Sequence, residues 1–393
     1  MTYDTAIINN PNISYLETEV SISEINDALN HINSVSTTLD KGMDDTAELT
    51  HISELAKDKQ IDSINDITTV AVENICSRLG YSGYKRTETI SLEGISDLIK
   101  KAWEAIKAMF KRMWEGLKGL WNKITNNTSK ATEKAQAAED KIQEIKKDNP
   151  EGFKVAITEV KSTEDNLRTF CHAFNTANAK QLNENIVTVL NNHLIFLNFL
   201  DKYIERSRAI FTELSKDKIE DIDGMLNLVK EALNNPPEKY KPVFSSKEGQ
   251  GIFLNSSYFK LDPRKSGGVF LATVGGFKVN NEYGHYPTEQ QFATIKKTLD
   301  AVADKLNKIM EPTKKLEKEV IAAIDKINSQ IQASKLDDVE TRFKLNQLNI
   351  MRSSLAIYSG NMLGLTATAV SRAAWYLEKS TSFIEDASNG KQQ

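Results

Sequence analysis

The apolar period between Ile95 and Ile124 is the feature that most constrains how this chain folds. Apolar residues recur there at steps of three, four and one, which places them on one face of an α-helix. The segment 94–124 also carries seven Lys/Arg against three Asp/Glu. These patterns predict a cationic amphipathic helix over residues 94–128, ending at Asn126 and Asn127.

Aromatic side chains are concentrated on the apolar face of this helix. Three of the four Trp residues of the chain fall within nineteen positions. Two interpretations stay open: the face packs in a protein core, or it lies in a membrane interface or against a partner protein. The residues that define the face are Trp103, Phe110, Trp114 and Trp121.

Helical periods also dominate the rest of the chain. They predict helices near 129–147, 163–175, 181–214 and 217–234, and two long antiparallel helices at 295–331 and 343–384, with Trp375 on the packed face and a kink at Pro312. Between them, the runs GIFLNSSYFKL and GGVFLATVGGFKVNN indicate a small antiparallel β-sheet with a turn at 262–267. The expected fold is therefore mainly α, an elongated bundle of long antiparallel helices with a small inserted sheet. We divide it into an acidic region (1–93), the amphipathic helix (94–128), a helical body (129–239), a β insertion (240–287) and a helical hairpin (288–393).

Charge divides the chain at Glu93 and Gly94. Residues 1–93 carry 16 Asp/Glu and 6 Lys/Arg, a net charge of −10, whereas residues 94–393 carry 38 and 44, a net charge of +6. The acidic region is expected to form short helices separated by polar loops such as 34–45, and the Gly-containing stretch 80–92 is expected to be an exposed connection.

Recognised catalytic and metal-binding patterns are missing from the sequence. Its five His residues show no metal-binding spacing, its two Cys residues cannot form a thiolate zinc site, and no nucleophile elbow or phosphate-binding loop is found. The two Cys residues are expected to be small buried hydrophobes. We therefore expect no enzyme activity, no cofactor, no metal and no small-molecule substrate. The N-terminal residues also lack the pattern of a signal peptide, and no apolar run is long enough to span a membrane.

A Ser-x-Glu tripeptide stands at the charge boundary: Ser91, Leu92 and Glu93, followed by Gly94 and the Lys-rich aromatic helix. In these features the chain resembles the internal head proteins of giant phiKZ-like tailed bacteriophages. The resemblance implies synthesis in the host cytoplasm, packaging inside the phage head, removal of an N-terminal propeptide by a prohead protease, and, in some members, ejection with the DNA. The implied partners are the prohead protease, other head proteins, and packaged DNA or the host membrane. Cleavage after Glu93 is expected to free the aromatic face of the new N-terminal helix.

Three alternatives stay open at this stage. Other tripeptides match the Ser/Ala/Gly-x-Glu pattern, and an acidic region 1–93 that is left intact is the alternative to cleavage after Glu93. A pore-forming toxin with long helices and a β tongue is a second reading, although Lys260, Asp262, Arg264 and Lys265 interrupt the tongue. An enzyme with an unrecognised site is the third.

Overall fold

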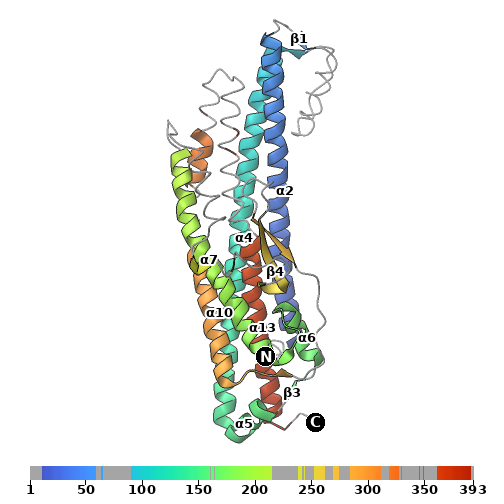
Figure 1. The fold of residues 1–393 in the computed structure, drawn as a ribbon, viewed down its shortest axis with the longest axis vertical. Helices are drawn as coiled ribbons and strands as arrows, with labels where there is room; N and C mark the ends of the chain where they lie inside the picture. Colours follow the sequence, from blue (N-terminus) through green and yellow to red (C-terminus); the bar gives the residue numbers. More distant parts are fainter. Residues whose placement is uncertain are drawn as a thin grey trace, which may run out of the picture.

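Long helices build an elongated bundle in the computed structural model of this chain (Figure 1). The structure describes residues 11–58, 63–64, 90–159, 161–162, 164–214, 238–240, 243, 252–261, 269–273, 284–310, 318–326, 329, 345, 348 and 361–390. Within these residues the predicted helical bundle is confirmed.

The longest helix is α4, Leu92–Asp148, with 57 residues and a length of about 85 Å. It runs through Asn126 and Asn127, so the helix end predicted there is wrong. Asn127 is buried, and its side-chain oxygen accepts a hydrogen bond from the hydroxyl of Ser371. Thr128 donates its own hydroxyl to the carbonyl four residues earlier. These partners make polar side chains compatible with a helix interior.

A second long helix, α2 (Pro11–Asp58), occupies most of the acidic region. The polar loop predicted at 34–45 is therefore wrong as well. The hydroxyls of Thr38, Thr46 and Thr50 each donate to the carbonyl four residues earlier, which satisfies them without leaving the helix.

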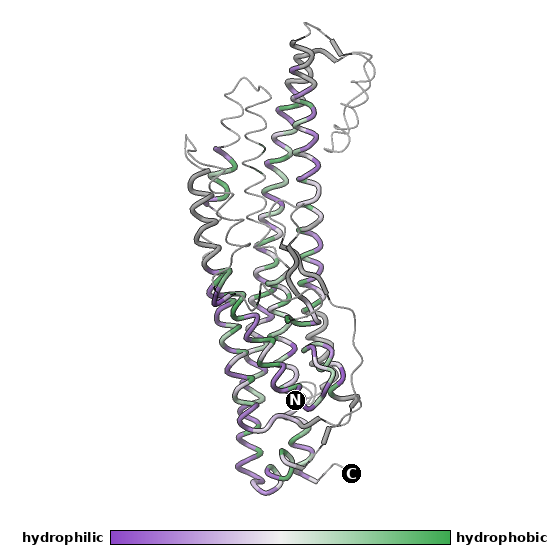
Figure 2. Tube along the Cα trace, in the orientation of Figure 1, coloured by the Kyte–Doolittle hydropathy of each residue, from purple (hydrophilic) through white to green (hydrophobic). Residues whose placement is uncertain are grey.

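The helices α2 and α4 run antiparallel along most of their length (Figure 1). Near one end Lys123 Nζ donates to the carbonyl of Glu24, and Gly116 lies beside Ile32. At the other end β1 (Ser63–Ile64) pairs antiparallel with β2 (Ile90–Ser91). Figure 2 shows hydrophobic and hydrophilic residues alternating along both helices, as expected of helices that bury one face.

The body of the bundle is completed by α7 (Leu182–Leu214), α10 (Glu289–Met310) and α13 (Asn361–Ser388). The boundaries of α7 match the prediction closely. Lys146 near the end of α4 pairs with Glu289 at 2.8 Å, so α10 begins at that end. Asn149, directly after α4, donates to the carbonyl of Ser388, so α13 ends there. The predicted antiparallel arrangement of α10 and α13 is therefore confirmed, and the predicted kink at Pro312 lies outside the described residues.

Three short helices join α4 to α7 along the chain. They are α5 (Pro150–Glu159), α6 (Glu164–Ala173) and η1 (Ala179–Gln181). Phe170 of α6 packs against Trp375 of α13, with 4.4 Å between the ring centroids. Trp375 is buried, as predicted.

Strands are few in the described residues and do not form the expected insertion. A single ladder joins β4 (Ser257–Leu261) to β5 (Val269–Thr273). The strand β6 (Gly284–His285) leaves that region and pairs with β3 (Lys161–Ser162). A small sheet over 240–287 is thus not supported as a unit, because one of its strands is paired outside the segment. The predicted turn at 262–267 lies outside the described residues.

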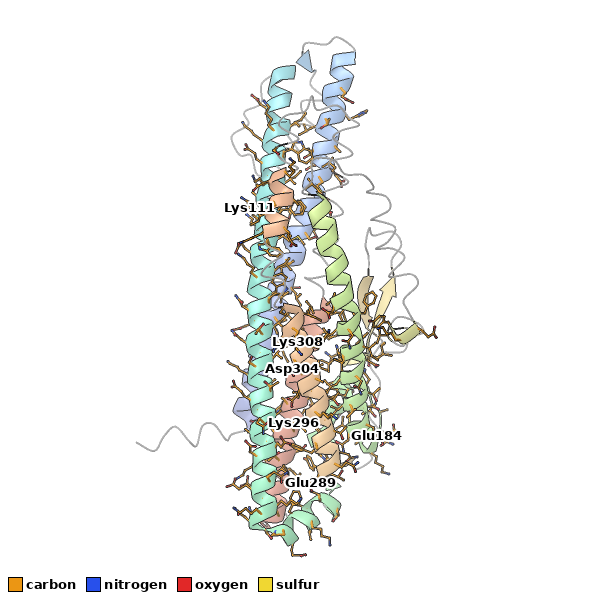
Figure 3. The ribbon with its side chains drawn as sticks, turned by 90° about the vertical axis from the view of Figure 1, so that its left-hand side faces the viewer. Lys111, Glu184, Glu289, Lys296, Asp304 and Lys308 are labelled. Carbon is orange, nitrogen blue, oxygen red and sulfur yellow. The ribbon has the colours of Figure 1, made fainter. Side chains whose placement is uncertain are left out.

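One hydrophobic core runs through the whole bundle. It joins buried residues of α2, α4, α7, α10 and α13. Ion pairs lie at the edge of this core. Lys296 of α10 (Figure 3) lies 3.3 Å from Glu139 of α4 and 2.8 Å from Asp300 of its own helix. The described part of the acidic region, α2, is therefore packed on the body through this core.

Candidate functional site: the groove that holds α2

The predicted processing tripeptide lies where two elements meet. Ser91 is the last residue of β2 and is paired with Ser63, whereas Leu92, Glu93 and Gly94 form the start of α4. The first N–H groups of a helix have no partner within the helix, so this turn opens more easily than the interior. The preceding connection, 80–89, lies outside the described residues.

The four aromatic residues predicted for a membrane or partner face are buried in the full chain. The exposed fractions are 3% for Trp103, 0% for Phe110, 2% for Trp114 and 5% for Trp121. The rings of Trp114 and Trp121 meet edge to face with 5.4 Å between their centroids. In this state the stripe belongs to the core, which is the first of the two interpretations left open by the sequence.

Helical geometry shows which neighbours cover this stripe. Gly116 marks the side of α4 that faces α2. Lys107, which pairs with Asp325 at 2.6 Å, lies roughly 180° around the helix from Gly116 at 100° per residue. By the same rule Trp103, Trp114 and Trp121 lie within roughly 40° of Lys107. The Trp residues therefore lie on the side of α4 that faces away from α2, the side on which Lys107 contacts Asp325, and removal of α2 alone leaves that side covered.

The side of α4 that α2 does cover forms a groove with α13. A methyl group on Gly116 would lie 3.0 Å from Ile32 Cγ1. On the other wall, a methyl group on Gly364 would lie 2.8 Å from Leu29 Cδ1 and 2.9 Å from Ile25 Cγ2. A methyl group on Gly364 would require Leu29 and Ile25 to shift, and one on Gly116 would press against Ile32, so glycine leaves the room that these α2 side chains occupy. The three α2 side chains are themselves buried.

A row of basic residues follows the edge of α4 beside this groove. Lys101, Arg112, Lys123 and Lys134 are spaced by eleven residues, which is about three helical turns and keeps them near one line on the helix. Opposite them, α2 carries ten Asp/Glu and two Lys. The spacing of eleven residues is visible in the sequence. The dominant period of three and four residues describes the apolar face of the helix and not this basic edge.

Two further features of the described residues have structural explanations. His193 is fully buried, with Nδ1 2.9 Å from Thr366 Oγ1 and Nε2 accepting from the N–H of Leu254. Because Thr366 donates its hydroxyl to Met362, the ring donates through Nδ1 and stays neutral. Its burial lowers the pKa of His193 to about 3. This residue ties together α7, α13 and η3 (Leu254–Ser256).

A cavity of about 350 Å³ lies between α7, α10 and η2 (Glu238–Tyr240). Two of the charged side chains that line it, Lys305 and Asp201, form an ion pair at 2.5 Å.

Burial raises the pKa of the Cys171 thiol to about 11, so this residue is an unreactive core side chain. The prediction of a small buried hydrophobe is confirmed for Cys171.

The described residues contain neither a cluster of metal ligands nor a helix able to span a membrane. No group of three His, Cys, Asp or Glu side chains among them is arranged to hold a metal ion. Within the same residues, no helix has the length and apolar character needed to cross a membrane.

Comparison with known proteins gives one match. The family model of phiKZ-like phage internal head proteins matches residues 66–378, which is about four fifths of the chain. The matched range includes Ser91–Gly94 and all of α4, and it begins after α2. No curated protein and no solved structure matches the chain.

Proposed function

Because this chain belongs to the phiKZ-like phage internal head proteins, we propose that it is a structural component of the phage head whose residues 1–93 are removed by the prohead protease after Glu93. The family places the protein inside the head. Other head proteins are its expected partners. The pore-forming alternative has no support from the family match.

The position of the tripeptide is the observation that carries this proposal. Glu93 stands where the net charge changes from −10 to +6, and it lies in the first turn of a helix. Three other tripeptides that match the pattern end at Glu104, Glu133 and Glu139, inside α4, and each contains a buried Ala. A protease needs an extended substrate, so cleavage at those sites requires the middle of α4 to unfold.

Charge gives the cleavage a physical purpose. The acidic region carries a net charge of −10 and would be repelled by packaged DNA, whereas the remaining chain has a net charge of +6. Removal of residues 1–93 thus leaves a body that is electrostatically compatible with DNA. Ejection with the DNA is a separate hypothesis, tested by comparing the protein content of particles before and after DNA release.

A pair of variants in infecting phage tests the cleavage. Glu93→Ala removes the acidic residue of the proposed site, whereas Glu104→Ala changes an exposed residue of a matching tripeptide within α4. We expect Glu93→Ala particles to keep the full-length chain and Glu104→Ala particles to process it normally. Normal processing of the Glu93→Ala chain would contradict the proposed site.

A further inference from the structure

The groove between α4 and α13 has the shape of a helix-binding site. At Gly116 and Gly364 its two walls lie so close to α2 that any larger side chain would displace Ile25, Leu29 or Ile32. Ile25, Leu29 and Ile32 of α2 enter it at steps of four and three, so one face of a single helix fills the groove.

The charges around the groove select the kind of helix. Lys101, Arg112 and Lys123 lie along its α4 edge, and Lys123 Nζ reaches the backbone of α2 at 3.3 Å. Two contacts fix the register of α2 against α4: Glu24 lies opposite Lys123, and Ile32 lies opposite Gly116. Because the helices are antiparallel, the residue numbers of any two facing positions add up to about 148. On this register Asp44 and Glu48 lie near Lys101, and Glu24 and Asp27 near Lys123. A second copy of the same basic groove would meet like charges.

We propose that this groove is a binding site for acidic amphipathic helices, that α2 is its occupant within the full chain, and that cleavage of the link to α4 opens it to an acidic helix of another head protein. The proposal rests on the proposed removal of residues 1–93. While α2 is tethered, its high effective concentration excludes competitors. After cleavage, α2 becomes an ordinary dissociable ligand, and a partner helix with apolar residues at i, i+4 and i+7 and flanking carboxylates takes its place.

Exchange in the purified full chain tests the proposal directly. A site for an added sequence-specific protease is introduced at residues 59–62, between α2 and β1, and the binding of fluorescent peptides is followed by anisotropy before and after cutting. The probes are a peptide of residues 11–58, an unrelated Glu-rich peptide with the same apolar spacing, and that second peptide with Lys in place of Glu. We expect the two acidic peptides to bind only the cut chain, more weakly as salt is raised, and the Lys peptide not to bind.

Two glycine variants test the groove, and a third glycine variant is their matched control. Gly116→Leu and Gly364→Leu fill the two close contacts and are expected to weaken binding of the acidic peptides at least about tenfold. Gly119→Leu adds the same side chain to α4 where nothing lies within 4 Å and is expected to leave binding unchanged. Three results would each overturn the proposal. The first is that the three variants bind the acidic peptides with the same affinity, and the second is that the cut chain does not bind these peptides. The third is that the Lys peptide binds the cut chain as well as the acidic peptides do.

Vesicles that contain anionic lipid test whether the groove binds a membrane surface instead of a helix. If they bind the cut chain and displace the acidic peptides, the groove is a lipid site and the proposal fails. The helix-binding proposal and the proposed cleavage can be disproved separately. A chain that keeps residues 1–93 in mature heads removes the proposed function while the groove still binds helices in vitro, and a groove without affinity leaves the cleavage at Glu93 untouched.

Discussion

At the scale of single residues, buried polar groups with partners far away in the sequence fix the arrangement of the helices. His193 joins Thr366 and Leu254, and Asn127 joins Ser371. Each of these groups is buried, so leaving it without a partner costs about 1–3 kcal/mol. The register between α4, α7 and α13 is therefore specified by hydrogen bonds as well as by packing.

The burial of His193 predicts a pH dependence of stability. Its folded-state pKa of about 3 lies below the ordinary value of 6.5, so the unfolded chain binds a proton that the folded chain refuses. The stabilisation is complete above about pH 6.5 and is lost as the pH falls toward 3. We expect urea midpoints of the wild type to decrease between pH 7 and pH 5, and His193→Gln to remove much of that decrease.

The control for this measurement is His172→Gln, because His172 is exposed on α6. It should retain the pH dependence of the wild type. At pH 7, His193→Gln should also be less stable by about 1–3 kcal/mol, since one flexible amide does not replace both ring contacts, to Thr366 Oγ1 and to the N–H of Leu254. An unchanged pH dependence in His193→Gln would contradict the role assigned to this residue.

At the scale of elements, the two sides of α4 serve different neighbours. The Trp stripe lies toward Lys107 and Asp325, and the glycine side holds α2. If residues 1–93 are removed after Glu93 as proposed, the groove beside Gly116 becomes exposed and the Trp stripe stays covered, which changes the expectation drawn from the sequence. The amphipathic period identified the helix but could not say which helix covers which side.

Because the stripe belongs to the body, we expect Trp114→Ala to destabilise the chain strongly whether or not α2 is attached. The loss should be about 3–5 kcal/mol, as for other large buried aromatic residues. Thermal or urea unfolding of the intact and the cut chain measures it. A Trp114→Ala change that mattered only while α2 was attached would show that the stripe faces α2.

The continuity of α4 can be measured as a distance. Spin labels at Lys111→Cys and Lys147→Cys, both exposed positions, are separated by 36 residues, about 54 Å in an unbroken helix. Cys76 is replaced by Ser to avoid labelling. We expect a single pulsed electron resonance distance near this value. A markedly shorter distance would mean that the helix bends or ends near Asn127.

At the scale of the whole molecule, sequence patterns predicted the elements better than their connections. The apolar period of 181–214 gave α7 almost to the residue, because that helix buries one continuous face. The breaks predicted at Asn126–Asn127 and at 34–45 failed because hydroxyl groups bond back to the helix and Ser371 supplies a distant partner. The expected sheet failed as a unit because β6 pairs with β3. A close-approach role for Gly116 and Gly364 requires knowledge of the packed neighbours, which local patterns do not contain.

In the full chain the acidic helix α2 packs on a basic body, and we propose that it is removed together with the rest of residues 1–93. The charge boundary, the helix start at Leu92 and the groove lined by Gly116 and Gly364 all support that description. Its central claim is the cleavage between Glu93 and Gly94.

The intact mass and N-terminal sequence of the protein taken from mature phage particles test this claim most directly. The account predicts a chain that begins at Gly94 and has lost the mass of residues 1–93. A chain from mature particles that still begins at Met1 or Thr2 would contradict it.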